Sequence, residues 1–247
     1  RLQIAFVDLH IVVVEKPPRV VSTRRPEELQ WPLAKRLLDP TLDELTSRAL
    51  LEREQGPLTA AALKRLRSLP RLWRVQRLDR DTSGVMVFAR SGDAAGELIQ
   101  QFSAHSVERT YRAVVQGIPT VGTIESRLVC DRGDGLRGSS NVGQQAITHV
   151  LSVAPIGGLS VIECRLETGR THQIRIHLAE QGHPVCGDDR YHQQRDGNVL
   201  HDESRAPRLA LHATRLAFDH PITRERLSFT SDWPQDLAQW LNLRATE

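Results

Sequence analysis

Two stretches of this chain gather charged side chains that could do chemistry. In residues 64–90, the carboxylates Asp79 and Asp81 stand among eight Lys and Arg side chains. Positive charge at this density attracts a phosphate backbone, so we expect a polyanion near Asp79. The same composition also fits a solvated basic helix followed by a turn, because Asp, Ser and Gly in residues 81–84 each stabilise turn geometry.

The second stretch is Glu167–Leu178, for which the pattern predicts a helix capped by Thr171 and running to about residue 181. On such a helix His172 and Arg175 lie three residues apart and share a face, with Ala179 one further turn along. Arg170 falls near the helix N-terminus, where phosphate binds well. The simpler alternative for both arginines is that they keep the surface soluble.

Three histidines raise the alternative of a metal-dependent hydrolase. His172 and His177 are five residues apart, which separates their rings on a helix, and His183 follows after the predicted helix end. Helical zinc sites use a spacing of four instead. We therefore expect no bound metal.

Composition and length set wider limits. The 247 residues fit one large domain or two small ones. A net charge of +3 is too small to prove an anionic partner by itself. The three cysteines show no CxxC pair or zinc spacing, so we expect reduced, buried thiols and no disulfide. No apolar run approaches the length of a membrane span. We expect a monomer in the cytoplasm that makes no membrane contact.

The elements that must position the charged residues mix strands and helices without a regular βαβ period, which favours an α+β fold. Residues 24–70 differ from the rest, with long charged side chains, leucines and several prolines, and we expect short helices there. Residues 131–144 are rich in Gly and Ser and are predicted to form a flexible loop. Strands are expected at 3–15 with a turn near 8–10, and at 85–89, 109–116, 123–129, 146–153, 159–167, 209–218 and 226–230, and helices after Ser91 and at 171–181 and 234–243.

One segment resembles a known signature. Arg77-Leu-Asp-Arg-Asp-Thr-Ser-Gly84 is similar to the RLDxxTSG motif of the RluA-type pseudouridine synthase family. Four further segments resemble that family in the same order, and together they span nearly the whole chain. They are Ile11–Pro18, Glu108–Gly117, Glu167–Leu178 with the following Gly182–Asp188, and Arg208–Ala213.

The resemblance implies a pseudouridine synthase fold: a bent mixed sheet, largely antiparallel, with flanking helices and a central RNA-binding cleft. It implies an enzyme that isomerises specific uridines in structured RNA, ribosomal or transfer, without a cofactor. We expect residues 1–247 to form one catalytic domain, with 24–70 as a helical insertion and no separate S4 domain. The alternative is an RNA-binding protein that keeps this fold but has lost catalysis.

The resemblance also implies roles for single residues. Asp79 would attack ribose C1′ or remove the 2′-proton, and the sequence leaves both routes open. Arg175 would pair with that carboxylate and favour its charged form. Tyr111 would stack on the base and assist proton transfer at C5.

Other positions are expected to bind RNA. The target base must leave its stack before it reacts, and either Arg77 or Gln76 would fill the space that it leaves. Gln76 departs from the family pattern, which usually has His at this position. The further RNA-binding residues that we expect are Arg71, Arg74, Arg80, Arg170 and His172.

Overall fold

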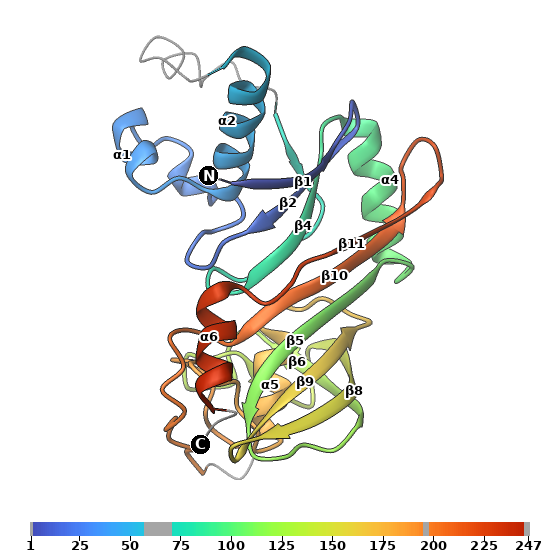
Figure 1. The fold of residues 1–247 in the computed structure, drawn as a ribbon. Coiled ribbons are helices and arrows are strands. Elements are labelled where there is room, and N and C mark those ends of the chain that lie inside the picture. Colours follow the sequence, from blue (N-terminus) through green and yellow to red (C-terminus); the bar gives the residue numbers. More distant parts are fainter. Residues whose placement is uncertain (1, 57–70, 195–197, 245–247) are drawn as a thin grey trace. The chain divides into compact units, whose positions relative to one another are not determined.

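The computed structural model describes residues 2–56, 71–194 and 198–244. The chain packs into two compact units (Figure 1). Unit 1 comprises Arg1–Val107 and Ala217–Phe229, and unit 2 comprises Glu108–Leu216 and Thr230–Glu247. The chain changes unit inside β10 (Leu211–Asp219) and again inside β11 (Arg226–Thr230), which pairs with β10.

Unit 1 is built on an antiparallel sheet with β2 (Ile11–Lys16) between β1 (Gln3–Val7) and β4 (Ser83–Ala89). The first four side chains of β2 are fully buried, which explains their unbroken apolar run. Asp8 forms the turn between β1 and β2, because its Oδ1 accepts hydrogen bonds from the amides of His10 and Ile11 at 2.7 and 2.8 Å. The predicted strand pair and its turn are therefore confirmed.

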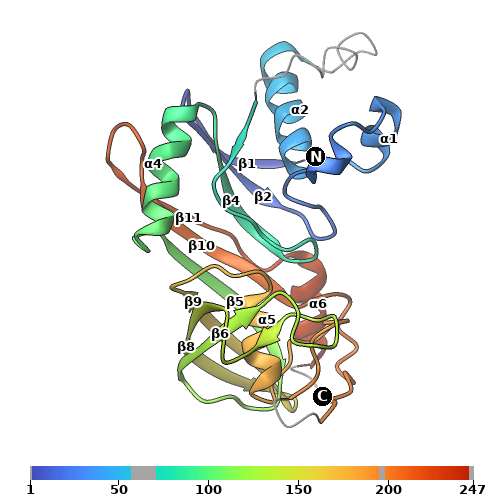
Figure 2. The same ribbon diagram turned by 180° about the vertical axis from the view of Figure 1, so that it is seen from behind.

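The helices of unit 1 lie on opposite sides of these strands, as Figures 1 and 2 both show for α2 (Leu42–Gln55) and α4 (Gly92–Ser103). The Oγ atom of Ser91 accepts a hydrogen bond from the amide of Ala94 at 3.2 Å, so the predicted cap of α4 is confirmed. Within 24–70, where helices are expected, the chain up to residue 56 forms η1 (Pro26–Glu28), α1 (Leu33–Leu38) and α2. Residues 57–70 lie outside the described part.

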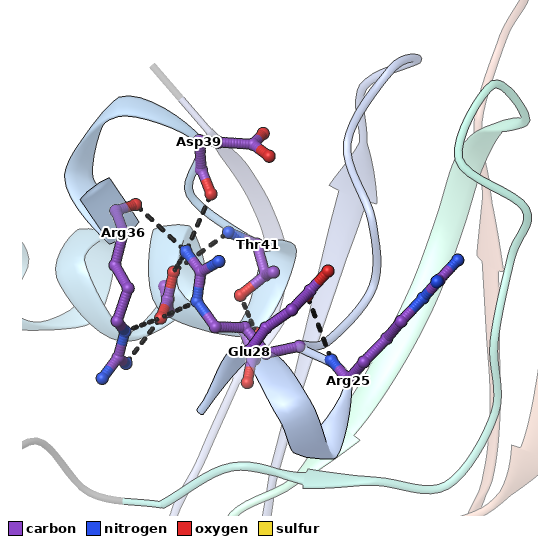
Figure 3. Close-up of polar contacts among 8 residues, drawn as sticks. Arg25, Glu28, Arg36, Asp39 and Thr41 are labelled. Atoms are coloured by element: carbon purple, nitrogen blue, oxygen red, sulfur yellow. Dashed lines mark hydrogen bonds and ion pairs between the residues drawn. The ribbon is translucent and has the colours of Figure 1, made fainter. Parts of the chain in front are cut away.

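A polar cluster ties this helical segment together, and Figure 3 labels Arg36, Asp39 and Thr41 among its members. Its centre is Glu44, in the first turn of α2. Arg24 donates to both carboxylate oxygens of Glu44, at 2.8 and 2.6 Å, and Arg36 donates from Nε at 2.8 Å. The Nη2 atom of Arg24 also donates to the carbonyl oxygen of Asp39 at 2.7 Å. Because the Arg24 side chain is only 3% exposed, Glu44 supplies the counter-charge that its burial requires.

Unit 2 contains a second run of antiparallel strands, shown from behind in Figure 2. Helix α5 (Gln173–Glu180) packs against β8 (Gln144–Ile156) and β6 (Gly122–Val129), and α6 (Gln235–Arg244) is the last described helix. The residues 131–144, predicted as a flexible loop, include the short strand β7 (Gly138–Ser139). In spatial order the strands are β5 (Glu108–Gln116), β9 (Leu159–Leu166), β8 (Gln144–Ile156), β6 (Gly122–Val129) and β7 (Gly138–Ser139).

The predicted α+β class and the largely antiparallel pairing are confirmed by this arrangement. In the stretches that the structure describes, no helix is both long and apolar enough to cross a membrane. The short strand β3 (Trp73–Arg74) pairs with β4 in unit 1, and the loop after it carries Asp79.

The cysteines are free thiols, and Cys164 and Cys186 are buried as expected. Burial raises the pKa of each of these two thiols to about 12, so both stay protonated. Cys130 is exposed, which corrects the expectation that all three are buried. Its strand β6 ends at residue 129, so Cys130 falls beyond the paired part of the sheet.

Candidate active site

Asp79 is half-buried in the loop between β3 and β4 of unit 1. The main chain on both sides of it is held by hydrogen bonds. Ser22 donates from Oγ to the carbonyl oxygen of Leu78 at 3.1 Å, and the amide of Thr82 donates to the carbonyl oxygen of Asp79 at 3.2 Å. A functional side chain must be held close to its working geometry, and this loop meets that requirement.

Lys16 holds the far side of the same loop. It is the last residue of β2 and only 2% exposed, and its Nζ donates to the carbonyl oxygens of Pro17, Arg80 and Thr82 at 3.0, 2.8 and 2.7 Å. An ammonium group has three hydrogens, and a buried charge is tolerated when its hydrogen bonds are made. The end of β2 is thereby fastened to the loop that carries Asp79.

The arginines around Asp79 that the structure describes face solvent. Arg74 donates from Nη1 to the hydroxyl oxygen of Thr23 at 3.2 Å, and the guanidinium of Arg71 lies 5.6 Å from the centre of the Trp73 ring. Exposed guanidinium groups can meet phosphate oxygens. The exposed arginines of this segment are Arg71, Arg74, Arg77 and Arg80.

This segment does not form the basic helix that its composition also allowed. Residues 71–82 contain β3 and a loop, with no helical turn. The basic residues Lys64, Arg65 and Arg67 lie outside the described residues. The alternative of a solvated basic helix is therefore wrong for residues 71–82.

Gln76 and Arg77, the two candidates for the space left by a flipped base, differ in exposure. Arg77 is exposed, whereas the Nε2 atom of Gln76 is covered and meets no acceptor among the described residues. A buried donor without an acceptor costs about 1–3 kcal/mol. The covered amide nitrogen of Gln76 therefore lowers the stability of the fold locally, whereas the side chain of Arg77 is accessible from solvent.

Tyr111 belongs to unit 2 and lies on β5, opposite Cys164 of β9. Its side chain is buried, with 7% of the residue exposed. The predicted strand at 109–116 is confirmed, since β5 spans Glu108–Gln116. The pairing with β9 fixes the face of the sheet on which the Tyr111 side chain lies.

Helix α5 begins later than predicted, and Thr171 does not cap it. The residue before the helix is His172, in the left-handed conformation with φ of 59° and with no side-chain cap. Gln173 stabilises the approach instead, because its Oε1 accepts hydrogen bonds from the amide of Arg170 at 3.0 Å and from Oγ1 of Thr168 at 2.8 Å. A Thr before an apolar run is a good cap signal, but here no side-chain cap forms, and Gln173 holds the segment before the helix.

Tyr191, which we did not predict, brings His172 and Arg175 to one place. Its hydroxyl group lies 2.7 Å from Nδ1 of His172, and its ring centre lies 4.9 Å from Cζ of Arg175. His172 and Arg175 are three residues apart, and their common contact with Tyr191 agrees with the shared helix face expected from this spacing. Arg170 is exposed beside them in sequence and donates from Nε to the carbonyl oxygen of Gln145 at 2.9 Å.

Arg175 forms a two-bond ion pair with Asp188. The distances are 2.6 Å from Nε to Oδ2 and 2.7 Å from Nη2 to Oδ1. The resemblance implied Asp79 as a carboxylate partner of Arg175, and that pairing stays a prediction beside the planar fork with Asp188. Asp188 ends a segment that resembles the family, yet no spacing in the sequence relates it to Arg175.

The three histidines of the metal alternative have separate surroundings. His177 lies between hydroxyl groups, with Nδ1 2.9 Å from Oγ1 of Thr148 and Nε2 3.0 Å from Oγ of Ser126. His172 contacts a tyrosine, and His183 places Nδ1 2.9 Å from a main-chain oxygen. Within the part of the chain that the structure describes, no three His, Cys, Asp or Glu side chains are grouped to hold a metal ion.

Comparison with known proteins decides the family. A family model described as RNA pseudouridylate synthase matches residues 10–180. Ribosomal large subunit pseudouridine synthase D of Zymomonas mobilis subsp. mobilis is 36% identical over 241 residues, which cover 96% of this chain and 70% of the relative. This chain belongs to the RNA pseudouridylate synthase family.

Members of the RNA pseudouridylate synthase family are isomerases that convert uridine in RNA into pseudouridine, so the predicted enzyme class is confirmed. These matches favour an active pseudouridine synthase over the alternative of an inactive RNA-binding protein. A relative of the same name from Neisseria meningitidis serogroup A is 40% identical over 189 residues, and the match covers 74% of this chain but only 50% of that relative. Among solved structures, human RNA pseudouridylate synthase domain containing 4 is similar with a TM-score of 0.70 and covers 99% of this chain and 93% of that chain. At 22% identity this likeness shows the fold alone.

Proposed function

We propose that this pseudouridine synthase acts on uridines of large-subunit ribosomal RNA, with Asp79 as the reacting carboxylate and without a cofactor. The relatives from Zymomonas mobilis and Neisseria meningitidis carry names that specify the large ribosomal subunit. This supports ribosomal over transfer RNA as the substrate. The observation that carries the role of Asp79 is its loop, whose main chain is held by Ser22 and Lys16.

The chemistry explains why a carboxylate is sufficient. The bond between ribose C1′ and uracil N1 breaks, the base turns, and a new bond forms between C1′ and C5. The C5 proton is lost to solvent and N1 gains a proton, so the atoms balance without any redox change. Asp79 serves either by attacking C1′ or by removing the 2′-proton, and both routes need its ionised form.

Arginine side chains accompany Asp79 along the same segment. Guanidinium groups attract the phosphate backbone of RNA. The exposed side chains of Arg71, Arg74 and Arg80 supply positive charge along the same segment. We assign these residues to phosphate contacts, which give affinity without sequence preference.

The remaining assignments rest on the family resemblance and on exposure. Arg77 is exposed and Gln76 has a covered amide nitrogen, which supports Arg77 as the residue that fills the vacated stack. We assign Tyr111 to the base and to proton transfer at C5, and Arg175 to stabilising the reacting carboxylate. Arg170 and His172 are assigned to RNA contacts. The single catalytic domain, the monomer and the cytoplasmic location stay predictions.

The experiment is a map of pseudouridines in ribosomal and transfer RNA from cells with and without the gene. We expect one or more large-subunit sites to disappear and to return when the wild-type gene is restored. Loss confined to transfer RNA would contradict the substrate, and loss of no site would contradict the function. Restoring the Asp79→Ala gene should leave the sites unmodified, while Asp81→Ala, a change in the same loop, should restore them.

A further inference from the structure

Asp188 holds Arg175 through a planar fork. Both carboxylate oxygens take part, at 2.6 and 2.7 Å from Nε and Nη2, and the two side chains are 5% and 1% exposed. Two parallel bonds in one plane fix the orientation of a guanidinium as well as its place. The third guanidinium nitrogen, Nη1, takes no part in this fork.

The carboxylate of Asp188 is placed by its own main-chain surroundings. Its Oδ1 accepts hydrogen bonds from the amides of Arg190 and Tyr191 at 2.9 and 3.1 Å. The preceding residue, Gly187, has φ of 73°, and a Cβ atom there would lie 2.1 Å from the carbonyl oxygen of Arg208. Only glycine fits such a position. The turn therefore sets the carboxylate without help from the arginine.

Tyr191 completes the surroundings of the guanidinium. The residue is 4% exposed, and the centre of its ring lies 4.9 Å from Cζ of Arg175. The hydroxyl group of the same tyrosine lies 2.7 Å from Nδ1 of His172. One face of the guanidinium thus lies against an aromatic ring that is itself fastened to the residue before α5.

We propose that Asp188 is a positioning residue for the pseudouridine synthase reaction, which acts by orienting Arg175, with Tyr191 as the surface against which the guanidinium rests. The proposal relies on the role given to Arg175 in the proposed function. Fold stability alone does not explain the ion pair, because a buried pair replaced by apolar side chains often costs nothing. A two-bond carboxylate partner does fix the orientation of a guanidinium.

The test compares kcat and KM for tritium release from an RNA substrate labelled at uridine C5. Asp188→Asn should lower kcat by about 10- to 100-fold and leave KM within about 3-fold, because misplacement of a reacting group slows the chemistry. The matched control is Asp134→Asn, since Asp134 also pairs with an arginine of unit 2, Arg132, but has a side chain that is 44% exposed. That variant should keep kcat within about 2-fold of wild type.

A double variant shows whether Asp188 acts through Arg175. The combination Asp188→Asn with Arg175→Met should be no slower than Arg175→Met alone, because residues that act as a unit are not additive. Multiplied losses would overturn the proposal. So would a wild-type kcat in folded Asp188→Asn while Arg175→Met is inactive, a result that leaves the proposed function intact.

Two further outcomes are decisive. A wild-type kcat in Arg175→Met would remove Arg175 from the proposed function, and the positioning role of Asp188 with it. If Asp188→Asn does not fold, the decision passes to Asp188→Glu, which keeps the charge and shifts the carboxylate by one methylene. A kcat reduced by about 5-fold or more in that variant supports the proposal, and an unchanged kcat overturns it.

Discussion

Lys16 donates from Nζ to the carbonyl oxygen of Arg80 at 2.8 Å, across 64 residues of sequence. The same ammonium group binds the carbonyl oxygen of Thr82 at 2.7 Å, so one buried side chain spans the loop just beyond Asp79. The loop is thereby coupled to β2, whose first four side chains are fully buried. The position of Asp79 therefore depends on a residue that lies far from it in the sequence.

Replacing Lys16 should therefore impair both stability and catalysis. Lys16→Met leaves the carbonyl oxygens of Arg80 and Thr82 without their donor and should lower the free energy of unfolding by about 1–3 kcal/mol. We expect kcat to fall by about 10-fold or more, because the loop loses its anchor, with the Kd for RNA within a few-fold. Lys35→Met is the control, since Lys35 is exposed. A folded Lys16→Met enzyme with wild-type kcat would show that this anchor does not position Asp79.

RNA affinity should depend steeply on salt because phosphate contacts release counterions. Each contact that is removed should reduce the slope of log K against log salt by about 1. We expect the triple variant Arg71→Gln, Arg74→Gln and Arg80→Gln to lose up to about 3 units of that slope. Filter binding at several salt concentrations measures it.

The control for this experiment changes three other exposed arginines of unit 1. The triple variant Arg53→Gln, Arg224→Gln and Arg226→Gln removes the same charge and should keep a steeper slope than the first triple variant. Equal slopes in both would mean that overall charge, and not the segment around Asp79, attracts the RNA.

The cluster around Glu44 should make the helical segment sensitive to acid. Burial by itself would raise the pKa of Glu44, but hydrogen bonds from Arg24 and Arg36 outweigh it and hold this pKa below the ordinary 4.5. A lowered folded pKa stabilises the protein above the unfolded pKa, and this stability is lost as pH falls below about 4.5. Glu44→Ala should cost about 2–3 kcal/mol at pH 7, since it leaves Arg24 buried without its partner.

Glu52→Ala is the matched change on the same helix, because Glu52 pairs with the half-exposed Arg48 one turn away. Such pairs contribute about 0.3–0.5 kcal/mol. Urea unfolding at pH 7 and pH 4 measures both variants. An equal cost for the two at pH 7 would contradict a structural role for the Glu44 cluster.

His212 should give a second, separate dependence of stability on pH. Burial lowers its pKa from 6.5 to about 4. A histidine whose pKa is lowered on folding is held in its neutral form. Its contribution to the free energy of unfolding is therefore complete above about pH 6.5 and falls as pH drops towards 4. The loss over this range is at most about 3 kcal/mol. His212→Gln should flatten the curve between pH 6.5 and 4, whereas the exposed His201→Gln should not.

The sequence predicted what depends on local pattern. The apolar run from Ile11 to Val14 indicated a buried strand, and Ser91 indicated a helix start, because burial and capping are decided within a few residues. Thr171 does not cap α5 because the residue before the helix is His172, in the left-handed conformation, a departure that residue type alone does not signal.

Contacts distant in sequence could not be predicted. Lys16 reaches a carbonyl oxygen 64 residues away, and Asp188 reaches Arg175 across a turn that depends on Gly187. Every residue has a backbone carbonyl oxygen, so the pattern of side chains does not show which ones Lys16 binds. The contact between Lys16 and the Asp79 loop is therefore visible only in the structure. The family resemblance indicated Asp79 as the candidate carboxylate, and the structure showed what holds its loop.

The most direct measurement of the central proposal is tritium release by Asp79→Ala from RNA carrying 5-tritiated uridine. The loss of the C5 proton is part of the isomerisation, so the assay reports the chemistry itself. We predict no release above background, with RNA Kd within a few-fold of wild type because phosphate contacts supply most of the affinity. Asp81→Ala, in the same loop, should release tritium at close to the wild-type rate. Release by Asp79→Ala at the wild-type rate would contradict the account.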